Sequence, residues 1–444
     1  MIMGNNALKW KFNSIIKLNV FLLAFMMNTL ASANDLSNVE PEAAGYDSAK
    51  LQSLTEDFDI LYEEGLIPNY VIAIAKDGQI FYEAVRGDSR IGSGNAVNLQ
   101  TIYPLASMTK PLVSVAIMRL IEEERLTLNS TLGEFFPQFE NMFVAPGGSL
   151  EVLEEANRKV EIVDLLTHTS GFTYGTAVTG VGDVADLYDE FRIINKCLER
   201  DENLEIVAQL PLVAQPGSAF NYSISTDILG AIIEVITDKK LGEYLEEILF
   251  EPLGMTEMDF TLSADDLANN WAMIYGEAGP GRSAIGRIQD SEIDWKLAEL
   301  SPVNNCPTAM THEDSRYKFD SGGGGIHGSA RDYLIFMTMI MNGGEYKGVR
   351  VISESSIDFM LTEYKQFEYP PIMENSIFGA GFGMDLELDD SSVVDFYRWG
   401  GAFNTGFWMD PVDRSVGVLF TSTYPGRFNL INDVEQIVDE ARIQ

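Results

Sequence analysis

Three stretches of the chain carry a serine followed three residues later by a lysine, a pattern that could supply a nucleophile and the amine that activates it. The patterns begin at Ser14, Ser107 and Ser315, so the pattern alone does not identify a site. Ser14 lies in an N-terminal segment with the features of a secretory signal, and Ser315 lies in the polar run THEDSRYKFD. Only Ser107, in PLASMTKPLVS, opens a long apolar helix. Ser107 and Lys110 are therefore the candidate pair, and the alternative is a helix cap beside a solvated lysine.

Pro111 limits where this helix can begin. Proline lacks an N–H group and is tolerated only in the first helical turn, where the N–H groups have no intrahelical partner. We therefore predict a helix that begins around residues 106–108 and runs to about Glu124. Ser107 then lies at the positive end of the helix dipole, which favours developing negative charge. Lys110 lies one turn on, and its burial would help it to hold or accept the hydroxyl proton.

Several other catalytic patterns are absent from the sequence. It has no Gly-x-Ser-x-Gly elbow, no His-Glu-x-x-His and no Gly-Lys-[Ser/Thr] phosphate loop. His168, His312 and His327 are scattered, so we expect no metal site. The glycines of SGGGGIHGS match a dinucleotide spacing, but no strand–turn–helix unit surrounds them, and we interpret the segment as a loop or sheet edge. No cofactor is expected.

The elements that must position the pair begin with a helix and a hairpin. Leu51, Leu54 and Phe58 recur at helical spacing, and Asp77-Gly78 between two β-rich runs predicts a tight hairpin. Helical patterns dominate the middle of the chain. The β-rich runs SVVDFYRWGG, GFWMD and SVGVLFTSTY follow, and LINDVEQIVDEARI closes the chain as an amphipathic helix.

This order of elements predicts an α/β fold with an inserted all-α domain. An antiparallel sheet flanked by helices would unite both ends of the chain, because its strands come as hairpins without helical crossovers. We assign residues 34–106 and 321–444 to a discontinuous α/β domain and residues 107–320 to a mainly helical domain.

The charge of the chain excludes some classes of partner. Acidic residues outnumber basic ones by 67 to 30, for a net charge of -37. Such a chain has no basic surplus for phosphate contacts, so we expect no nucleic-acid partner, and docking on an anionic membrane is disfavoured. The simplest interpretation is a solvated acidic surface, and a specific cationic partner is the alternative.

The N-terminus has the parts of a secretory signal. Lysines precede the apolar run VFLLAFMMNTL, and the small-x-small sequence ASA follows at residues 31–33. We predict a signal peptide over residues 1–33, a mature chain from near Asn34 without a membrane span, and a periplasmic or extracellular location. An uncleaved anchor is the alternative.

The only cysteines are Cys197 and Cys306, and we expect two buried free thiols rather than a disulfide.

The stretch around Ser107 resembles the Ser-x-x-Lys nucleophile motif of serine β-lactamases and penicillin-binding proteins. Other segments are similar to the branch with class C β-lactamases and family VIII carboxylesterases, and they occur in consistent order over about residues 40–430. These segments are LLTHTSGF, QPGSAFNYSISTDILGAIIE, EPLGMTEMDF, SGGGGIHGSARDY and WGGAFNTGFWMDP. The resemblance implies the β-lactamase/DD-peptidase-like fold and a covalent acyl-enzyme mechanism.

The resemblance also implies site residues. Tyr222 stands where the family has its second base, and a phenol, which ionises only near pH ~10, needs a cation such as Lys110 beside it. Trp399, Gly400 and Gly401 occupy the place of the Lys-Thr-Gly strand and would bind substrate. The backbone N–H groups of Ser107 and Ala402 would form the oxyanion hole. Tyr222 and Trp399 as ordinary core aromatics are the alternative.

Two departures from the β-lactamase pattern bear on the substrate. Tyr222 is followed by Ser223 and Ile224 where many β-lactamases have Tyr-x-Asn, and Trp399 replaces the lysine that attracts a lactam carboxylate. Both favour neutral apolar acyl groups. We therefore predict an exported serine hydrolase of carboxylic esters acting on a small-molecule ester or amide. The alternatives are a β-lactamase or D-amino-acid peptidase and a non-hydrolysing sensor. The sequence gives no indication of oligomeric state.

Overall fold

The computed structural model describes residues 36–176, 180, 182–191, 193–194, 197–277, 297–299, 318–364, 376–387, 392–424 and 430–443. The predicted signal peptide, His312 and Cys306 lie outside the described residues. In the part of the chain that is described, no helix combines the length and apolar character needed to cross a membrane.

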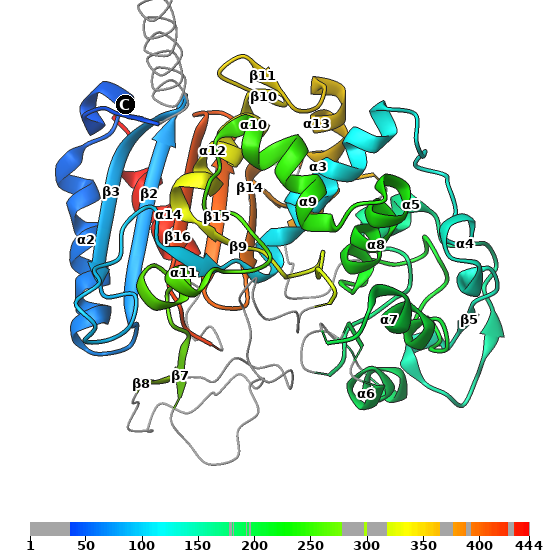
Figure 1. Ribbon diagram of the computed structural model, residues 1–444. Coiled ribbons are helices and arrows are strands. Elements are labelled where there is room, and N and C mark those ends of the chain that lie inside the picture. Colours follow the sequence, from blue (N-terminus) through cyan, green and yellow to red (C-terminus); the bar gives the residue numbers. More distant parts are fainter. Residues whose placement is uncertain are drawn as a thin grey trace, which may run out of the picture.

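Among the described residues, an eight-stranded sheet forms the centre of the fold (Figure 1). Its order is β1-β3-β2-β16-β15-β14-β13-β12, so strands from the two ends of the chain meet where β2 pairs with β16. The pairing is antiparallel as predicted, except that β1 pairs with β3 in parallel. The strands are β1 (Ser37–Asn38), β2 (Asn69–Lys76), β3 (Gln79–Gly87), β12 (Ser376–Phe378), β13 (Gly383–Leu386), β14 (Val394–Gly401), β15 (Thr405–Asp410) and β16 (Ser415–Phe420).

The two faces of the sheet bury separate hydrophobic cores. Helices α2 (Ser48–Glu63) and α14 (Leu430–Glu440) cover one face, and α12 (Ala330–Met341) lies on the other (Figure 1). Side chains along β2 alternate between the cores because successive residues of a strand point to opposite faces. Tyr70, Ile72 and Ile74 belong to the α2/α14 core, and Val71, Ala73 and Ala75 belong to the α12 core.

The predicted N-terminal helix and hairpin are both present. Asp47 caps α2 by accepting hydrogen bonds from two backbone N–H groups, and Leu51, Leu54 and Phe58 are the buried residues of this helix. The turn between β2 and β3 consists of Asp77 and Gly78, with φ of 50° and 78°. Positive φ at both positions is the geometry of the type I′ turn that the Asp-Gly pair favours.

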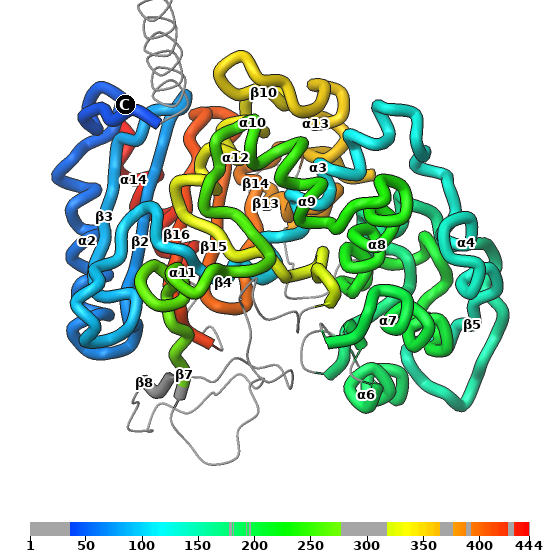
Figure 2. The backbone as a smooth tube through the Cα atoms, viewed as in Figure 1, coloured from blue at the N-terminus to red at the C-terminus, as the bar shows by residue number. Residues whose placement is uncertain are grey.

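The middle of the chain is mainly helical and packs beside the α12 face of the sheet (Figure 2). Its helices are α3 (Thr109–Glu122), α4 (Leu132–Phe135), α5 (Ile162–Leu166), α6 (Gly182–Phe191), α7 (Arg200–Val207), α8 (Ser225–Thr237), α9 (Leu241–Leu245), the π-helical turn Glu246–Phe250, α10 (Glu251–Leu253) and α11 (Ala264–Asn269); α13 (Glu354–Met360) follows α12. Short pairs join β4 (Ile102–Pro104) to β9 (His327–Ser329), β5 (Phe143–Val144) to β6 (Glu154–Glu155), β7 (Tyr275–Glu277) to β8 (Leu297–Glu299) and β10 (Glu345–Tyr346) to β11 (Val349–Arg350).

The predicted α/β fold, with a sheet flanked by helices and a helical insertion, agrees with this architecture, while the exact domain boundaries stay a prediction. The expectation for Cys197 is wrong, because Cys197 is disulfide-bonded rather than a free thiol. Sequence spacing could not reveal this, since a disulfide requires two cysteines whose Cα atoms lie within about 7 Å of each other.

Candidate active site

Ser107 lies in a 3₁₀ helix of one turn, Ala106–Met108, which leads from β4 into α3. The helical segment thus begins where Pro111 required, and α3 ends at Glu122, close to the predicted Glu124. Ala106 has a φ of 45°, a conformation that is strained for a residue with a side chain. The backbone therefore makes a sharp bend immediately before Ser107, which is half-buried at the helix start.

Lys110 is fully buried and its ammonium group is directed at Ser107. Lys110 Nζ lies 3.2 Å from Ser107 Oγ and donates a second hydrogen bond of 2.6 Å to the backbone carbonyl of Gly323. The prediction that the two side chains share one helix face is confirmed. The rings of Tyr222 and Tyr174 lie 4.7 and 5.6 Å from the same nitrogen, so aromatic faces surround the buried cation.

Tyr222 lies three residues before the start of α8, which brings its ring to Lys110. Trp399 Nε1 donates a hydrogen bond of 3.3 Å to the phenolic oxygen of Tyr222. This hydrogen bond fixes the phenolic oxygen of Tyr222 against β14. Burial, together with the nearby Asp227 and Tyr222, raises the pKa of Tyr174 well above its ordinary value. Tyr174 therefore stays protonated beside Lys110.

His168 of the LLTHTSGF segment is hydrogen-bonded to the two residues that flank Tyr222. The backbone carbonyl of His168 accepts a hydrogen bond of 2.7 Å from the N–H of Asn221, and its Nδ1 accepts one of 3.2 Å from the N–H of Ser223. Burial and the charge of Lys110 lower the pKa of His168 well below its ordinary value, so the imidazole is neutral. Because Nδ1 is an acceptor, we assign the ring proton to Nε2.

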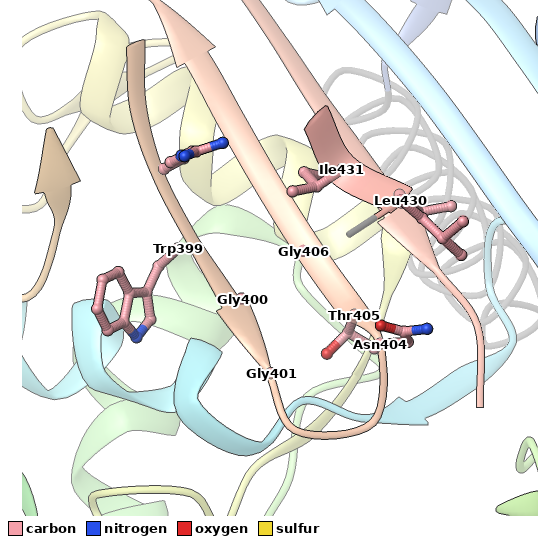
Figure 3. A pocket seen from close by; sticks show the side chains of 10 residues that line it. Trp399, Gly400, Gly401, Asn404, Thr405, Gly406, Leu430 and Ile431 are labelled. Carbon is pink, nitrogen blue, oxygen red and sulfur yellow. The ribbon is translucent and has the colours of Figure 1, made fainter. Parts of the chain in front are cut away.

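Trp399 on β14 completes an aromatic wall beside Tyr222. Its ring centroid lies 5.3 Å from that of Tyr222 and 4.9 Å from that of Phe378 on β12. The indole lies against Gly383 of β13, where an added Cβ would come within 2.9 Å of the ring. Figure 3 shows the indole on the opposite side of β14 from Leu430 and Ile431. Trp399 thus presents a neutral hydrogen-bond donor and an apolar face beside Tyr222.

Arg398 points to the other face of the sheet from Trp399, because successive residues of a strand point to opposite faces. It forms ion pairs with Asp385 at 2.5 Å and with Glu435 of α14 at 3.1 Å, and it also contacts Asn432. Burial raises the pKa of Glu435 to about 7, although Arg398 acts in the opposite direction. The guanidinium therefore lies on the α14 side of the sheet and supplies no positive charge to the face that carries Trp399.

Gly401, the last residue of β14, packs closely against Leu105 in the segment that precedes Ser107. A Cβ added to Gly401 would lie 2.3 Å from the carbonyl oxygen of Leu105 and 2.3 Å from Thr405 Oγ1. Only glycine permits this approach, which brings the turn with Ala402 next to the 3₁₀ turn of Ser107. A cavity of about 260 Å³ borders the hairpin and is also lined by Leu430 and Ile431 (Figure 3).

The fold thus joins the predicted Ser107, Lys110, Tyr222 and Trp399 through direct contacts. Gly400 and Gly401 follow on the same strand, and the assignment of Ala402 to an oxyanion hole stays a prediction. Other residues of the site escaped the sequence arguments. Tyr174 and Gly323 carried no chemical signal of their own, and His168 was considered only as a metal ligand, although its motif follows the nucleophile helix.

The comparisons with known proteins bear on the family and on the fold. The family model for β-lactamases matches residues 52–441. Esterase EstB of Burkholderia gladioli is 29% identical over 404 residues, which cover 88% of this chain and 95% of EstB. Among solved structures, EstCE1, described as a hydrolase with promiscuous acyltransferase activity, has a TM-score of 0.70 at 22% identity and covers 89% of this chain and 98% of its own. Simvastatin synthase LovD of Aspergillus terreus has a TM-score of 0.70 at 20% identity, with coverage of 88% and 97%.

Proposed function

The chain belongs to the β-lactamase family, and on that basis we propose that this serine hydrolase cleaves carboxylic esters with neutral, apolar acyl groups. The observation that carries the proposal is the hydrogen bond between Lys110 Nζ and Ser107 Oγ inside an aromatic enclosure formed by Tyr222, Tyr174 and Trp399. The similarity to esterase EstB over most of both chains supports the same conclusion.

The reaction begins with attack of Ser107 Oγ on the ester carbonyl carbon. The hydroxyl proton passes to the Lys110/Tyr222 pair, since Lys110 is in hydrogen-bonding range of Ser107 and Tyr222 lies beside it. The negative oxygen of the tetrahedral intermediate is held by the backbone N–H groups of Ser107 and Ala402. Collapse of the intermediate breaks the bond to the alcohol, which takes the proton from the pair.

The second half of the reaction releases the acid. Water attacks the acyl carbon while the Lys110/Tyr222 pair accepts its proton, and the same proton returns to Ser107 Oγ as the acyl–oxygen bond breaks. Trp399 acts on Tyr222 by its N–H group, which can stabilise negative charge on the phenolic oxygen through both steps. Its indole face also offers an apolar wall to the acyl group.

A fluorophosphonate probe tests the nucleophile. Labelling is expected at Ser107 in the wild type and is expected to disappear in Ser107→Ala, as read by peptide mass spectrometry. Equal labelling of both proteins would remove Ser107 from the mechanism.

The substrate class is tested by kcat/KM on short-chain p-nitrophenyl esters, on nitrocefin and on D-alanyl peptides. A kcat/KM for nitrocefin or the peptides that exceeds the ester value by orders of magnitude would replace the ester proposal.

We also propose that the protein is exported, on the strength of the signal-like sequence at residues 1–33. Expression of the full chain in a bacterial host should give a mature N-terminus near Asn34 in the periplasmic or extracellular fraction. Intact mass spectrometry and N-terminal sequencing of each fraction measure this. A chain that retains residues 1–33 in the membrane fraction would instead support an uncleaved anchor.

A further inference from the structure

The buried carboxyl group of Asp227 on α8 is hydrogen-bonded to the loop whose Gly323 carbonyl contacts Lys110. Asp227 is 2% exposed, and its Oδ1 accepts a hydrogen bond of 2.5 Å from the hydroxyl of Ser321 and one of 3.0 Å from the backbone N–H of Gly323. The carbonyl of the same Gly323 accepts the 2.6 Å hydrogen bond from Lys110 Nζ. We propose that Asp227 is a positioning residue for the reaction, acting through Gly323 to hold the Lys110 ammonium at Ser107.

The glycines of this loop allow its close approach to α8. A Cβ on Gly322 would lie 2.4 Å from the carbonyl oxygen of Thr226, and a Cβ on Gly323 would lie 2.2 Å from Asp227 Oδ2. Gly230, one turn further along α8, would also crowd the loop, because its Cβ would lie 3.4 Å from the Cα of Gly322. The glycine run that resembles a dinucleotide fingerprint therefore serves close packing of backbone on helix.

The first turn of α8 thereby fixes two of the groups around the Lys110 ammonium, the Tyr222 ring and the Gly323 carbonyl. Tyr222 precedes this turn by three residues, and Asp227 is its third residue. Lys110 Nζ lies between the Tyr222 ring at 4.7 Å and the Gly323 carbonyl at 2.6 Å. A lysine side chain has four rotatable bonds, so an ammonium without these two neighbours would sample positions away from Ser107. Loss of the hydrogen bonds to Asp227 would free the Gly323 loop, and with it the carbonyl that holds Lys110 Nζ.

The inference rests on the proposed function, and the rate of fluorophosphonate labelling of Ser107 tests it without assuming a substrate. Asp227→Asn weakens the acceptor while preserving its shape, because a carboxylate accepts a hydrogen bond more strongly than an amide does. We expect labelling about tenfold to a hundredfold slower, the range that a displacement of about 1 Å can cause. Gly323→Ala pushes the loop away from Asp227 and should slow labelling similarly.

Asp410→Asn is the matched control. Asp410 is 3% exposed, and its Oδ1 accepts hydrogen bonds from the backbone N–H groups of Val412 and Asp413, so the substitution likewise weakens a buried acceptor of backbone hydrogen bonds. Asp410 also forms an ion pair with Arg442, and the loss of that pair should act on thermal stability. Asp410 is the last residue of β15, and Thr405, the first residue of that strand, lies near the site. Asp410 is therefore about 17 Å from Thr405 along the strand. We expect this variant to label at the wild-type rate whatever its effect on thermal stability.

A double-mutant cycle distinguishes positioning of Lys110 from general support of the fold. If Asp227 acts through Lys110, then Asp227→Asn adds less than about a twofold loss to a Lys110→Ala protein, since coupled residues are not additive. Full additivity, or wild-type labelling of Asp227→Asn, would overturn this inference and leave the proposed function intact. A wild-type protein that is not labelled at Ser107 would overturn both.

Discussion

His168 accepts a hydrogen bond from the backbone N–H group on each side of Tyr222, and the two rings lie 4.7 Å apart, centroid to centroid. One residue therefore fixes the position of Tyr222 through its own backbone, its side-chain nitrogen and its ring face. His168 has a φ of 54°, so this arrangement also holds a strained backbone conformation.

A pair of substitutions at His168 separates these contributions. His168→Asn places an amide oxygen where Nδ1 accepts and suits a positive φ, while His168→Phe keeps a ring and loses the acceptor. A buried N–H without a partner costs about 1–3 kcal/mol, so kcat should fall more in the phenylalanine variant. Steady-state kinetics on a neutral ester measure this. A phenylalanine variant as active as the asparagine variant would show that the hydrogen bond to Ser223 has no role in positioning Tyr222.

The neutral state of His168 also predicts a pH dependence of stability. Its pKa in the folded protein is lowered well below the ordinary value, so below about pH 6.5 the unfolded chain binds a proton that the folded protein does not. The free energy of unfolding should therefore decrease as the pH falls from about 7 to 5. Denaturant titrations at both pH values measure the decrease, which should be smaller in His168→Asn. An equal decrease in both proteins would assign it to other groups.

The sequence predicted the parts of the site that depend on local geometry. Pro111 could be used to place the start of α3 because proline is excluded from helix interiors, and the Ser107–Lys110 contact follows from helix spacing. The other partner of Lys110 could not be predicted this way. Gly323 lies 213 positions further along the chain and reaches Lys110 only because its loop packs on α8.

The same limit applies to Trp399 and Tyr222. Strand alternation puts Trp399 and its neighbour Arg398 on opposite faces of the sheet, and the family resemblance implied that Trp399 faces the site. The hydrogen bond from Trp399 Nε1 to Tyr222, however, joins residues 177 positions apart and depends on how the sheet meets the helical segment. Neither spacing nor periodicity carries information about such a contact.

Trp399 gives a prediction with two opposite substitutions. Trp399→Phe keeps an aromatic wall but removes the N–H donor to Tyr222, so kcat for neutral esters should fall by about tenfold, the cost of one hydrogen bond of about 1.4 kcal/mol. Trp399→Lys supplies a cation, so the ratio of kcat/KM for nitrocefin to that for a neutral ester should rise. Unchanged ratios would show that the Trp399 side chain does not contact the substrate.

The contact between Gly401 and Leu105 gives the last prediction, which concerns the oxyanion hole. In Gly401→Ala the new methyl group would meet the Leu105 carbonyl and Thr405 Oγ1, both at 2.3 Å, so the turn with Ala402 must move away from the Ser107 turn. Stabilisation of the tetrahedral intermediate depends on donors at about 3 Å, and loss of one donor costs about a hundredfold or more in kcat.

Gly400→Ala is the matched control for this prediction. Its methyl group would lie 3.2 Å from the Thr405 carbonyl, a tight contact that a small shift relieves. We therefore expect Gly401→Ala to lose most of its kcat with a smaller change in KM, and Gly400→Ala to lose far less, at comparable thermal stability. Equal kcat values in the two variants would show that the approach of β14 to Leu105 does not set the position of the oxyanion donor, and Ala402 would then lose its assigned role.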